Sequence, residues 1–286
     1  MKKLFLLIGL MGIVATSCDD FLEEDYTEVH KIWYTSTDGK IVEPFPPVSE
    51  GQFGANILSN NYYGSQGIIK FDDEVTTIGA SAFAKCGNLK SIILPNSVAS
   101  IGGVAFINCG SLESITIPNG VTSIGEMAFK SCKSLKSITI PDGVTKIDSE
   151  TFLECSSLES VSLGNGVTEI GYRAFRECSS LKSAVIPDNV TWVQQEAFIA
   201  CKELETVTLG SGVTMIGIWA FASCSSLESV YCKATTPPHL ETSGFVETFK
   251  GCASNCTFYV PTESVSAYKN DDDWRKYADN IVGYDF

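Results

Sequence analysis

Hydrophobic positions recur through the middle of the chain with an unchanging period of 23 residues. Phenylalanines keep this step from Phe83 to Phe221, and leucines keep it from Leu89 to Leu227. Seven cysteines follow the same step: Cys86, Cys109, Cys132, Cys155, Cys178, Cys201 and Cys224. A fixed period of this length predicts a solenoid, in which each coil stacks only on its neighbours.

Each repeat contains a short segment in which apolar and polar residues alternate. In Ser114-Ile115-Thr116-Ile117 the isoleucines are expected to face the core and the hydroxyl side chains to face solvent. A proline ends the segment in several repeats, at Pro95, Pro118, Pro141 and Pro187. Proline cannot donate to a continuing ladder. We therefore predict one parallel β-strand in each coil.

The remainder of each repeat holds a second apolar run and then a glycine before an Ala-Phe-x-x-Cys segment. The run at 121–124 and the segment that follows Gly125 are typical. The spacing of Ala, Phe and Cys fits one helical turn with Phe and Cys on one face, so a short helical or irregular segment is expected opposite the strand. A single coil buries too little apolar surface to offset the entropy of ordering it, so folding requires the stack.

The repeat resembles a known family at this point. Leu112-x-x-Ile115-x-Ile117 is similar to the core of a leucine-rich repeat, and the Cys spacing, the Ala-Phe pair and the proline after the strand resemble the BspA-like subclass of bacterial surface proteins. The resemblance implies an α/β solenoid, a leucine-rich-repeat-like stack of 23-residue coils with one parallel strand per coil and non-repeat caps at both ends. The corner that usually carries an asparagine ladder holds Ser97, Gly120, Gly143, Gly166, Asn189 and Gly212, so side-chain amides cannot cap it uniformly.

The chain is expected to divide into five segments. They are a lipoprotein signal peptide at 1–17, an acidic tether at 18–30, a β-rich N-terminal cap at 31–67, the solenoid at 68–260 and a C-terminal capping segment at 261–286. In the N-terminal cap, 32–36 and 39–42 are predicted to form a hairpin around a turn at 37–39. Ile69 and Phe71 lie 23 residues before Ile92 and Leu94, which predicts the first solenoid strand at 68–71.

An eighth coil is expected near the C-terminus. Phe249 and Cys252 keep the Phe-x-x-Cys spacing after a five-residue insertion at 235–239. A helix is predicted at 264–269, and Trp274, Tyr277 and Ile281 are expected to cover the open end of the stack.

The N-terminus predicts export and anchoring. Met1-Lys2-Lys3 precedes an apolar run at 4–15, the pattern of a signal peptide. Ala15-Thr16-Ser17-Cys18 resembles a lipobox, which implies lipidation of Cys18 and a place at the outer membrane or cell surface; an ordinary cleaved secretion signal is the alternative. The acidic run at 19–25 resembles a surface-export signal, and solubility alone is its other interpretation. No other stretch is long and apolar enough to span a bilayer.

The net charge and the sequence motifs bear on which ligands the protein could bind and which reactions it could catalyse. The formal net charge is −14, so phosphate repulsion disfavours a nucleic-acid partner. The two histidines, His30 and His239, lie on opposite sides of the repeats, and no zinc-protease, nucleophile-elbow or phosphate-loop motif occurs. We predict that the protein is not an enzyme and uses no cofactor.

The cysteines are predicted to be small buried apolar groups. A metal site needs thiolates that converge, commonly from C-x-x-C pairs, whereas each of these is alone in its coil and points the same way. No metal site is therefore expected. Cys232, Cys252 and Cys256 depart from the repeat pattern, and a disulfide among them is left open.

The position four residues after each cysteine alternates in charge over most of the repeats. It holds Lys90, Glu113, Lys136, Glu159, Lys182, Glu205 and Glu228. Stacked coils place such side chains about 5 Å apart. Alternation avoids like-charged neighbours, so we interpret this row as structural.

A candidate binding patch comes from large apolar residues at positions where other coils carry polar ones. It comprises Tyr172, Trp192, Met215, Ile218, Trp219, Tyr231 and Tyr259. Exposed apolar groups of this kind indicate a contact surface. Local packing beneath the C-terminal cap is the alternative interpretation.

These observations predict a lipid-anchored surface protein whose solenoid binds a protein or glycan ligand. The family resemblance implies adhesion to host matrix or to other bacteria, with the Ser/Thr strand face and the candidate patch as the contact surface. One alternative is a glycan-binding accessory lipoprotein or an enzyme with an unrecognised site. The segment Cys18-Asp19-Asp20-Phe21-Leu22 weakly resembles the N-terminus of glycan-binding outer-membrane lipoproteins. A structural envelope component is the other alternative.

Overall fold

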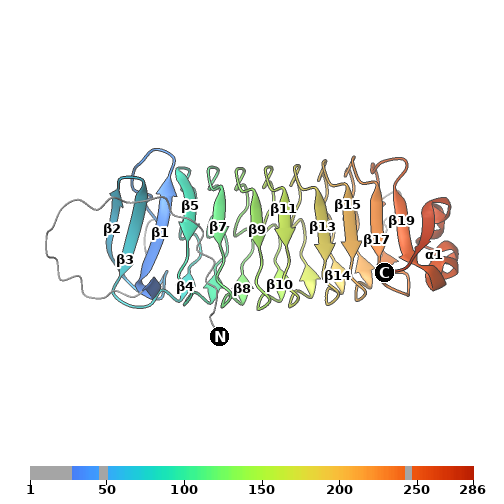
Figure 1. The fold of residues 1–286 in the computed structure, drawn as a ribbon, viewed down its shortest axis with the longest axis horizontal. Coiled ribbons are helices and arrows are strands. Elements are labelled where there is room, and N and C mark those ends of the chain that lie inside the picture. The colour runs from blue at the N-terminus through green and yellow to red at the C-terminus, as the bar shows by residue number, and fades with distance from the viewer. Residues whose placement is uncertain (1–27, 45–50, 242–246) are drawn as a thin grey trace, which may run out of the picture.

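The protein is a single elongated stack of coils. A computed structural model describes residues 28–44, 51–241 and 247–286. The coils follow one another along the long axis, from the N-terminal strands to the short helix α1 at the other end (Figure 1). Strands of successive coils pair in parallel between residues 23 apart, such as Ser137 with Ser160 and Ser183 with Thr206. The predicted solenoid and its period are confirmed.

One row of strands, hydrogen-bonded in three groups that follow one another along the stack, forms the face that the alternating segments predict. It consists of β5 (Leu89–Ile93), β7 (Ser114–Thr116), β9 (Ser137–Thr139), β11 (Ser160–Ser162), β13 (Ser183–Ile186), β15 (Thr206–Leu209), β17 (Ser229–Cys232) and β19 (Thr257–Pro261). We call it the long-strand sheet. Its outward side chains are mostly Ser and Thr, and its inward ones are mostly buried Ile and Val.

A second strand of two residues occurs in each coil, beyond the single strand predicted. This row, which we call the short-strand sheet, is hydrogen-bonded in two groups. The first holds β4 (Thr77–Ile78), β6 (Ser100–Ile101) and β8 (Ser123–Ile124), and the second holds β10 (Lys146–Ile147), β12 (Glu169–Ile170), β14 (Trp192–Val193), β16 (Met215–Ile216) and β18 (His239–Leu240). In several coils the residue after this strand is a glycine that lies against the coil before it. A Cβ on Gly102 would lie 2.5 Å from the amide nitrogen of Ala80.

The Ala-Phe-x-x-Cys segment does not form a helical turn; of the two options, helical or irregular, the structure has the irregular one. In one coil, Val104 and Asn108 have positive φ angles of 52° and 60° on either side of Phe106, and other coils repeat this pattern. The N–H groups of these three residues donate to carbonyls of the next coil, at 2.7–2.8 Å. The stack thus takes up the donors that a helix would bond internally.

The core is a column of aromatic rings with aliphatic side chains around it. Its rings belong to Phe83, Phe106, Phe129, Phe152, Phe175, Phe198, Phe221 and Phe249. Neighbouring ring centroids lie 5.0–5.4 Å apart, with planes 2–11° from parallel. At the N-terminal end Phe53 packs on Phe83, at 5.8 Å, and closes the column.

The N-terminal strands differ from the predicted hairpin. The 3₁₀ turn η1 (Glu28–His30) leads into β1 (Lys31–Ser36), which pairs antiparallel with β3 (Gln66–Phe71) and with β5. The hairpin that does form joins β2 (Ile57–Tyr63) to β3. Residues 39–42 are not a strand, because side chains satisfy their backbone: the amide of Val42 donates to the Tyr34 hydroxyl, and Asn60 donates to the carbonyl of Val42.

The first solenoid strand lies where it was predicted, within β3, but it does not stack directly on the next one. In the long-strand sheet β1 is inserted between β3 and β5 (Figure 1). On the other side of the coil β4 pairs with β6 without an insertion. The N-terminal cap therefore contributes a strand to the long-strand sheet in addition to covering the end of the stack.

The asparagine-ladder corner is capped unevenly, as expected. The Ser97 hydroxyl donates to the carbonyl of Val75, and the Asn189 amide donates to the carbonyl of Asn165, both at 2.7 Å. Glycine occupies the position in several other coils. Two coils thus keep a side-chain rung to the previous coil.

The C-terminal end is closed by η2 (Thr262–Ser264), α1 (Val265–Asn270), η3 (Arg275–Asn280) and β20 (Ile281–Tyr284). The helix predicted at 264–269 is thus present, shifted by one residue. Trp274 is fully buried, donates its indole N–H to the carbonyl of Pro238 at 2.7 Å, and packs against Phe258. Among the described residues no helix combines the length and apolar character needed to cross a bilayer.

Candidate binding surfaces

The cysteine ladder is part of the core. From Cys109 to Cys224 each thiol donates to the phenylalanine carbonyl of the preceding coil, as Cys178 does to Phe152 at 3.2 Å. Cys86, in the first of these coils, donates to the carbonyl of Glu43 instead. Burial raises the pKa of the Cys155 thiol to about 12 and that of Cys86 to about 11. The structure confirms the predicted burial of the ladder.

No alternative chemistry for the cysteines is seen in the described ranges. Cys232, Cys252 and Cys256 are free thiols there. No group of three or more His, Cys, Asp or Glu side chains is placed to hold a metal ion in residues 28–44, 51–241 and 247–286. Burial also raises the pKa values of the Cys232, Cys252 and Cys256 thiols above the ordinary thiol value, so these three thiols are poor nucleophiles at neutral pH.

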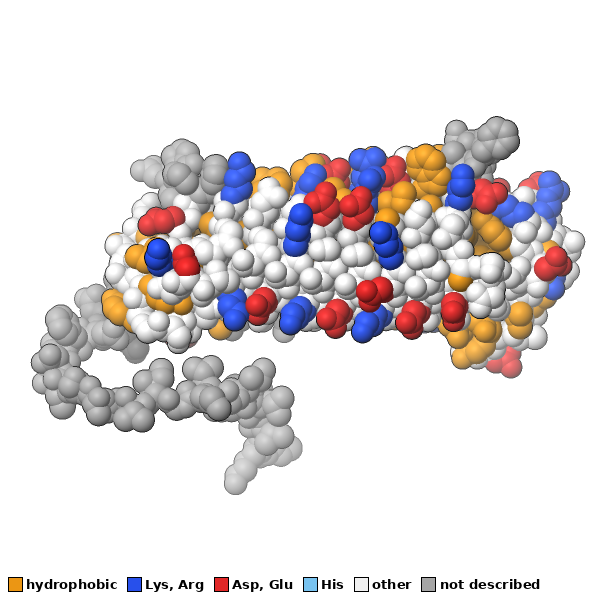
Figure 2. Space-filling model, turned by 90° about the horizontal axis from the view of Figure 1, so that it is seen from above, with side chains coloured by type: hydrophobic (Ala, Val, Ile, Leu, Met, Phe, Trp, Pro, Cys, Tyr) orange, Lys and Arg blue, Asp and Glu red, His pale blue; other side chains and the backbone are white. Residues whose placement is uncertain are grey.

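The row of alternating charges runs along the start of the long strands. Its backbone amides link coil to coil, as Glu113 donates to the carbonyl of Lys90 at 2.8 Å. The side chains of the same two residues form an ion pair at 3.8 Å. Figure 2 shows a row of alternating basic and acidic side chains along one edge of the face drawn, and hydrophobic side chains gathered at its C-terminal end. The geometry agrees with a structural role for the row.

The candidate patch falls into two sets on different sheets. Trp192 and Met215 pair with each other in β14 and β16 of the short-strand sheet. Tyr172, Ile218 and Trp219 lie just beyond the strands of that sheet. All five are half-buried, and the indole nitrogen of Trp192 is buried without a hydrogen-bond partner.

The second set lies on the outer face of the long-strand sheet. Tyr231 and Tyr259 stack with centroids 4.6 Å apart and planes 11° from parallel. Tyr284 packs edge-on against Tyr231 at 5.3 Å, and Phe286 packs against Tyr284 at 5.0 Å. We call these four rings the aromatic cluster. Tyr284 is 43% exposed and Phe286 is 53% exposed, so the cluster presents ring surface to solvent.

A small hollow adjoins the aromatic cluster. It measures about 340 Å³ and is lined by Lys233, Thr235, Pro261, Glu263, Tyr284, Asp285 and Phe286. Sequence reasoning assigned Tyr284 and Phe286 no role in binding, since neither belongs to a repeat. The only signal was their aromatic character close to the end of the last predicted segment.

A buried ion cluster lies on the edge formed by the Ala-Phe turns. Glu196 is 4% exposed and accepts hydrogen bonds from Arg173 at 2.7 Å and from Arg176 at 2.8 Å. Burial acts to raise the pKa of the Glu196 carboxyl, but the hydrogen bonds from Arg173 and Gln195 outweigh it, and its pKa is lowered. Arg173 and Arg176 thus bind Glu196 within the protein, so we do not assign them to a ligand site.

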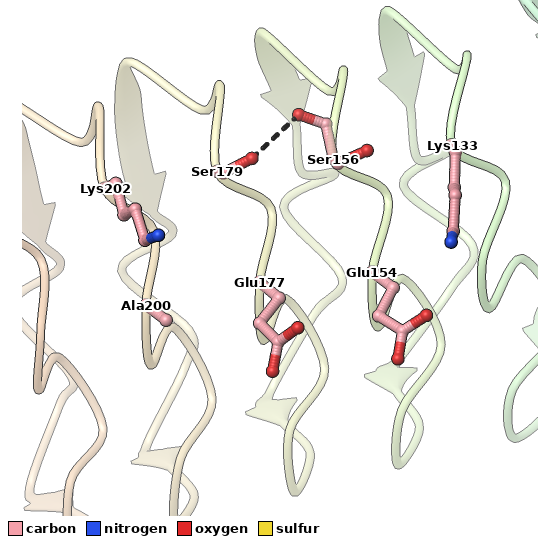
Figure 3. A pocket seen from close by; sticks show the side chains of 7 residues that line it. All are labelled: Lys133, Glu154, Ser156, Glu177, Ser179, Ala200 and Lys202. Carbon is pink, nitrogen blue, oxygen red and sulfur yellow. Dashed lines mark hydrogen bonds between the residues drawn. The ribbon is translucent and has the colours of Figure 1, made fainter.

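A groove of about 640 Å³ crosses four coils beside the cysteine ladder. It is lined by Lys133, Glu154, Ser156, Glu177, Ser179, Ala200 and Lys202, and we call it the turn groove. Figure 3 shows a lysine at each end and the two glutamates between them, from adjacent coils. The Ser179 hydroxyl donates to the carbonyl of Ser156 at 3.2 Å.

The groove exists because one repeat position changes size. The residue after the cysteine is lysine in the two outer coils and serine in the two coils between. Both lysines are exposed, whereas both serines are half-buried. Sequence reasoning missed this site, although the Lys-Ser-Ser-Lys succession at steps of 23 is visible in the sequence.

His239 lies in β18, and its ring Nδ1 is 2.7 Å from a carboxylate oxygen of Asp273. The same oxygen accepts the backbone N–H of Leu240 at 3.0 Å. This contact ties the insertion at 235–239 to the C-terminal cap. His30 is distant in the fold, in η1 at the other end.

Fold and surface together define a class of protein: a parallel β-solenoid of leucine-rich-repeat type whose outer faces are available for contact. The family model described as BspA type leucine rich repeat region, in six copies, matches residues 56–182 and 145–267. The chain belongs to this BspA-type leucine-rich-repeat family. Such repeats are typically binding modules without catalytic activity. None of the curated proteins compared with the sequence matches it.

One of the similar solved structures supports the fold, and two others are reported for comparison. A leucine-rich repeat protein from Eubacterium ventriosum is 22% identical, with a TM-score of 0.53, over 70% of this chain and 50% of that one. The present chain therefore spans half the length of that protein. A leucine-rich repeat protein from Bacteroides ovatus is 24% identical over 81% of this chain and 74% of that one, with a TM-score of 0.48. A leucine rich cell surface protein from Faecalibacterium prausnitzii is 21% identical over 79% and 86%, with a TM-score of 0.32.

Proposed function

We propose that the protein is a lipid-anchored binding module at the bacterial surface, and that the outer face of its long-strand sheet holds a protein or glycan ligand. The lipobox-like residues 15–18 support the anchor; they lie outside the described residues. The family membership supports a binding role, and one of the similar proteins carries the words cell surface in its name. On this proposal the protein has no catalytic activity.

The observation that carries the proposal is the aromatic cluster. Stacked, partly exposed tyrosines sit at the end of a flat face whose other outward side chains are mainly Ser and Thr. Tyrosine supplies a large apolar surface with a polar hydroxyl, the combination enriched in interface anchors. The fold does not require a tyrosine at this position, because Thr116, Thr139 and Thr208 occupy the position of Tyr231 in other coils.

The glycan alternative keeps one specific support. An aromatic platform beside hydroxyl and carboxylate groups suits the stacking of a sugar ring, and the hollow next to Tyr284 holds Glu263 and Asp285. The five patch residues on the short-strand side are all half-buried, whereas Tyr284 and Phe286 of the aromatic cluster are exposed. We therefore assign the primary contact to the aromatic cluster.

The test is a binding assay on cells that carry the full chain. In a Tyr231→Thr, Tyr259→Thr, Tyr284→Ser variant, binding to immobilised matrix proteins, to partner bacteria and to a glycan array should fall at least about tenfold, since anchor residues typically contribute more than 1.4 kcal/mol each. Surface expression is measured in parallel to show that the variant folds.

Val185→Thr is the matched control. Val185 occupies the same repeat position as Tyr231 but lies outside the cluster, and it is 60% exposed. Its substitution should leave binding unchanged. A triple variant that is expressed normally and binds every ligand as the wild type does would refute the proposal. Loss of binding in a Trp192→Ser, Met215→Ser variant alone would move the contact to the short-strand sheet.

A further inference from the structure

The turn groove has features of a second, separate binding site. Lys133 and Lys202 at its ends form no ion pair with any described residue. Glu154 between them accepts one hydrogen bond, from the Ser131 hydroxyl at 2.9 Å. Glu177 accepts one from Arg176 at 3.1 Å and remains 46% exposed. Charges of both signs are thus left with unused hydrogen-bonding capacity around one hollow.

The order of these charges along the stack is regular. Lys133, Glu154, Glu177 and Lys202 belong to four successive coils. Parallel strands of neighbouring coils lie about 4.8 Å apart, so the two lysines are about 14 Å apart and the glutamates lie at about one-third and two-thirds of that distance. The pattern is positive at both ends and negative in the middle.

An extended peptide has the matching repeat. It rises about 3.4 Å per residue, and residues i, i+2 and i+4 project to the same side. Residue i+4 is therefore about 14 Å from residue i, and residue i+2 falls about 7 Å along, midway between the two glutamates. One basic side chain would face both carboxylates, and one acidic side chain would face each lysine.

We propose that the turn groove binds an extended segment of a partner protein with the pattern acidic-x-basic-x-acidic. Arginine fits the centre best, because its planar fork can donate to two carboxylates at once. The serines that floor the groove leave room for the peptide backbone and offer hydroxyl groups to it. No aromatic ring lines the groove, so it lacks the platform on which a sugar would stack.

The test uses a fluorescein-labelled peptide of sequence Glu-Ser-Arg-Ser-Glu with blocked ends, and fluorescence anisotropy on the full chain. Saturable binding is expected to the wild type. In a Glu154→Gln, Glu177→Gln variant the affinity should drop at least about tenfold, the loss expected for charge-assisted hydrogen bonds. The same loss is expected for wild type with a peptide that carries Gln in place of Arg.

Reversal of the end charges provides a gain of function. A Lys133→Glu, Lys202→Glu variant should lose the first peptide and bind Lys-Ser-Arg-Ser-Lys in its place. Since all four side chains are partly exposed and lie outside the Phe column, these variants should melt at the same temperature as the wild type, which circular dichroism checks.

Glu159→Gln, Glu205→Gln is the matched control, because it removes the same charge from the strand-edge row. It should bind the peptide as the wild type does, and so should the triple variant in the aromatic cluster. If the peptide does not bind the turn groove, the proposed function of the aromatic cluster is therefore still valid, because the two sites are tested by different variants. The inference is wrong if wild type shows no saturable binding, if the control loses as much as the groove variant, or if an acidic glycan such as polygalacturonate binds the groove where the peptide does not.

Discussion

At the scale of single residues, the recurring cysteine shows why a small polarizable group is kept in a buried column. The carbonyl of Phe152 accepts the N–H of Cys155 in its own coil and the thiol of Cys178 in the next. A carbonyl has two lone pairs, so both bonds can form. The thiol therefore fills space in the core and also links one coil to the next.

Replacement of one thiol measures that link. Cys178→Ala should lower the free energy of unfolding by about 1–2 kcal/mol, from the loss of a weak hydrogen bond and a small cavity. Urea denaturation of the full chain gives the difference. Ser160→Ala, on the exposed strand face, is the control and should stay within about 0.5 kcal/mol of wild type. Equal values for the two variants would show that the thiol contributes nothing.

At the scale of the structural elements, close approach between coils decides where side chains are tolerated. A Cβ on Gly166 would lie 1.9 Å from the carbonyl oxygen of Asp142 in the preceding coil. Gly110 sits at another turn, with nothing within 4 Å of a Cβ. Neither glycine has a positive φ, so backbone preference does not separate them. Only the stacking distance does.

This difference predicts opposite outcomes for one substitution. Gly166→Ala should destabilise the protein by about 1–3 kcal/mol, because the added methyl group forces neighbouring coils apart. Gly110→Ala should be neutral or slightly stabilising, since it only restricts the unfolded chain. Thermal melts of both variants test the pair, and a melting temperature for Gly166→Ala at or above that of Gly110→Ala would contradict the close packing.

At the scale of the whole molecule, the stack is closed at both ends by different means. Phe53 and the inserted strand β1 complete the N-terminal coil, while Trp274 and β20 cover the other end. Between them, coils share one column of buried thiols and rings. A change in the charge of that column therefore affects the entire molecule.

Alkaline pH is such a change. Burial raises the thiol pKa values from the ordinary 9.0, to about 11 for Cys86 and Cys256 and to about 12 for Cys155. A raised folded-state pKa means that stability is complete below pH 9, where both states are protonated. It is lost as pH rises toward the folded pKa, at about 1.4 kcal/mol per thiol and pH unit.

The melting temperature should therefore fall steeply between pH 9 and pH 11. Cys178→Ala, with one buried thiol fewer, should show a shallower decline over the same range. A melting temperature that stays constant from pH 8 to pH 11, or an equal slope in the variant, would disprove the linkage.

The repeated part of the fold could be predicted from sequence because the same local pattern occurs many times. Alternation in Ser114-Ile115-Thr116-Ile117 indicates which side chains face inward, and the fixed step of Cys and Phe predicts that they stack in columns. Each coil meets a neighbour with the same pattern, so local preference and tertiary contact agree. The class of the fold follows from that agreement.

Tertiary structure determined those parts of the fold in which the local sequence pattern of a segment does not match the contacts that the segment makes. Strand β1 leaves its expected hairpin because β3 and β5 offer it two partners, and the Ala-Phe turns give their N–H groups to the next coil in place of a helix. The aromatic cluster and the turn groove join residues from several coils and from the C-terminal cap. Their positions depend on long-range contacts, which no short window of sequence contains.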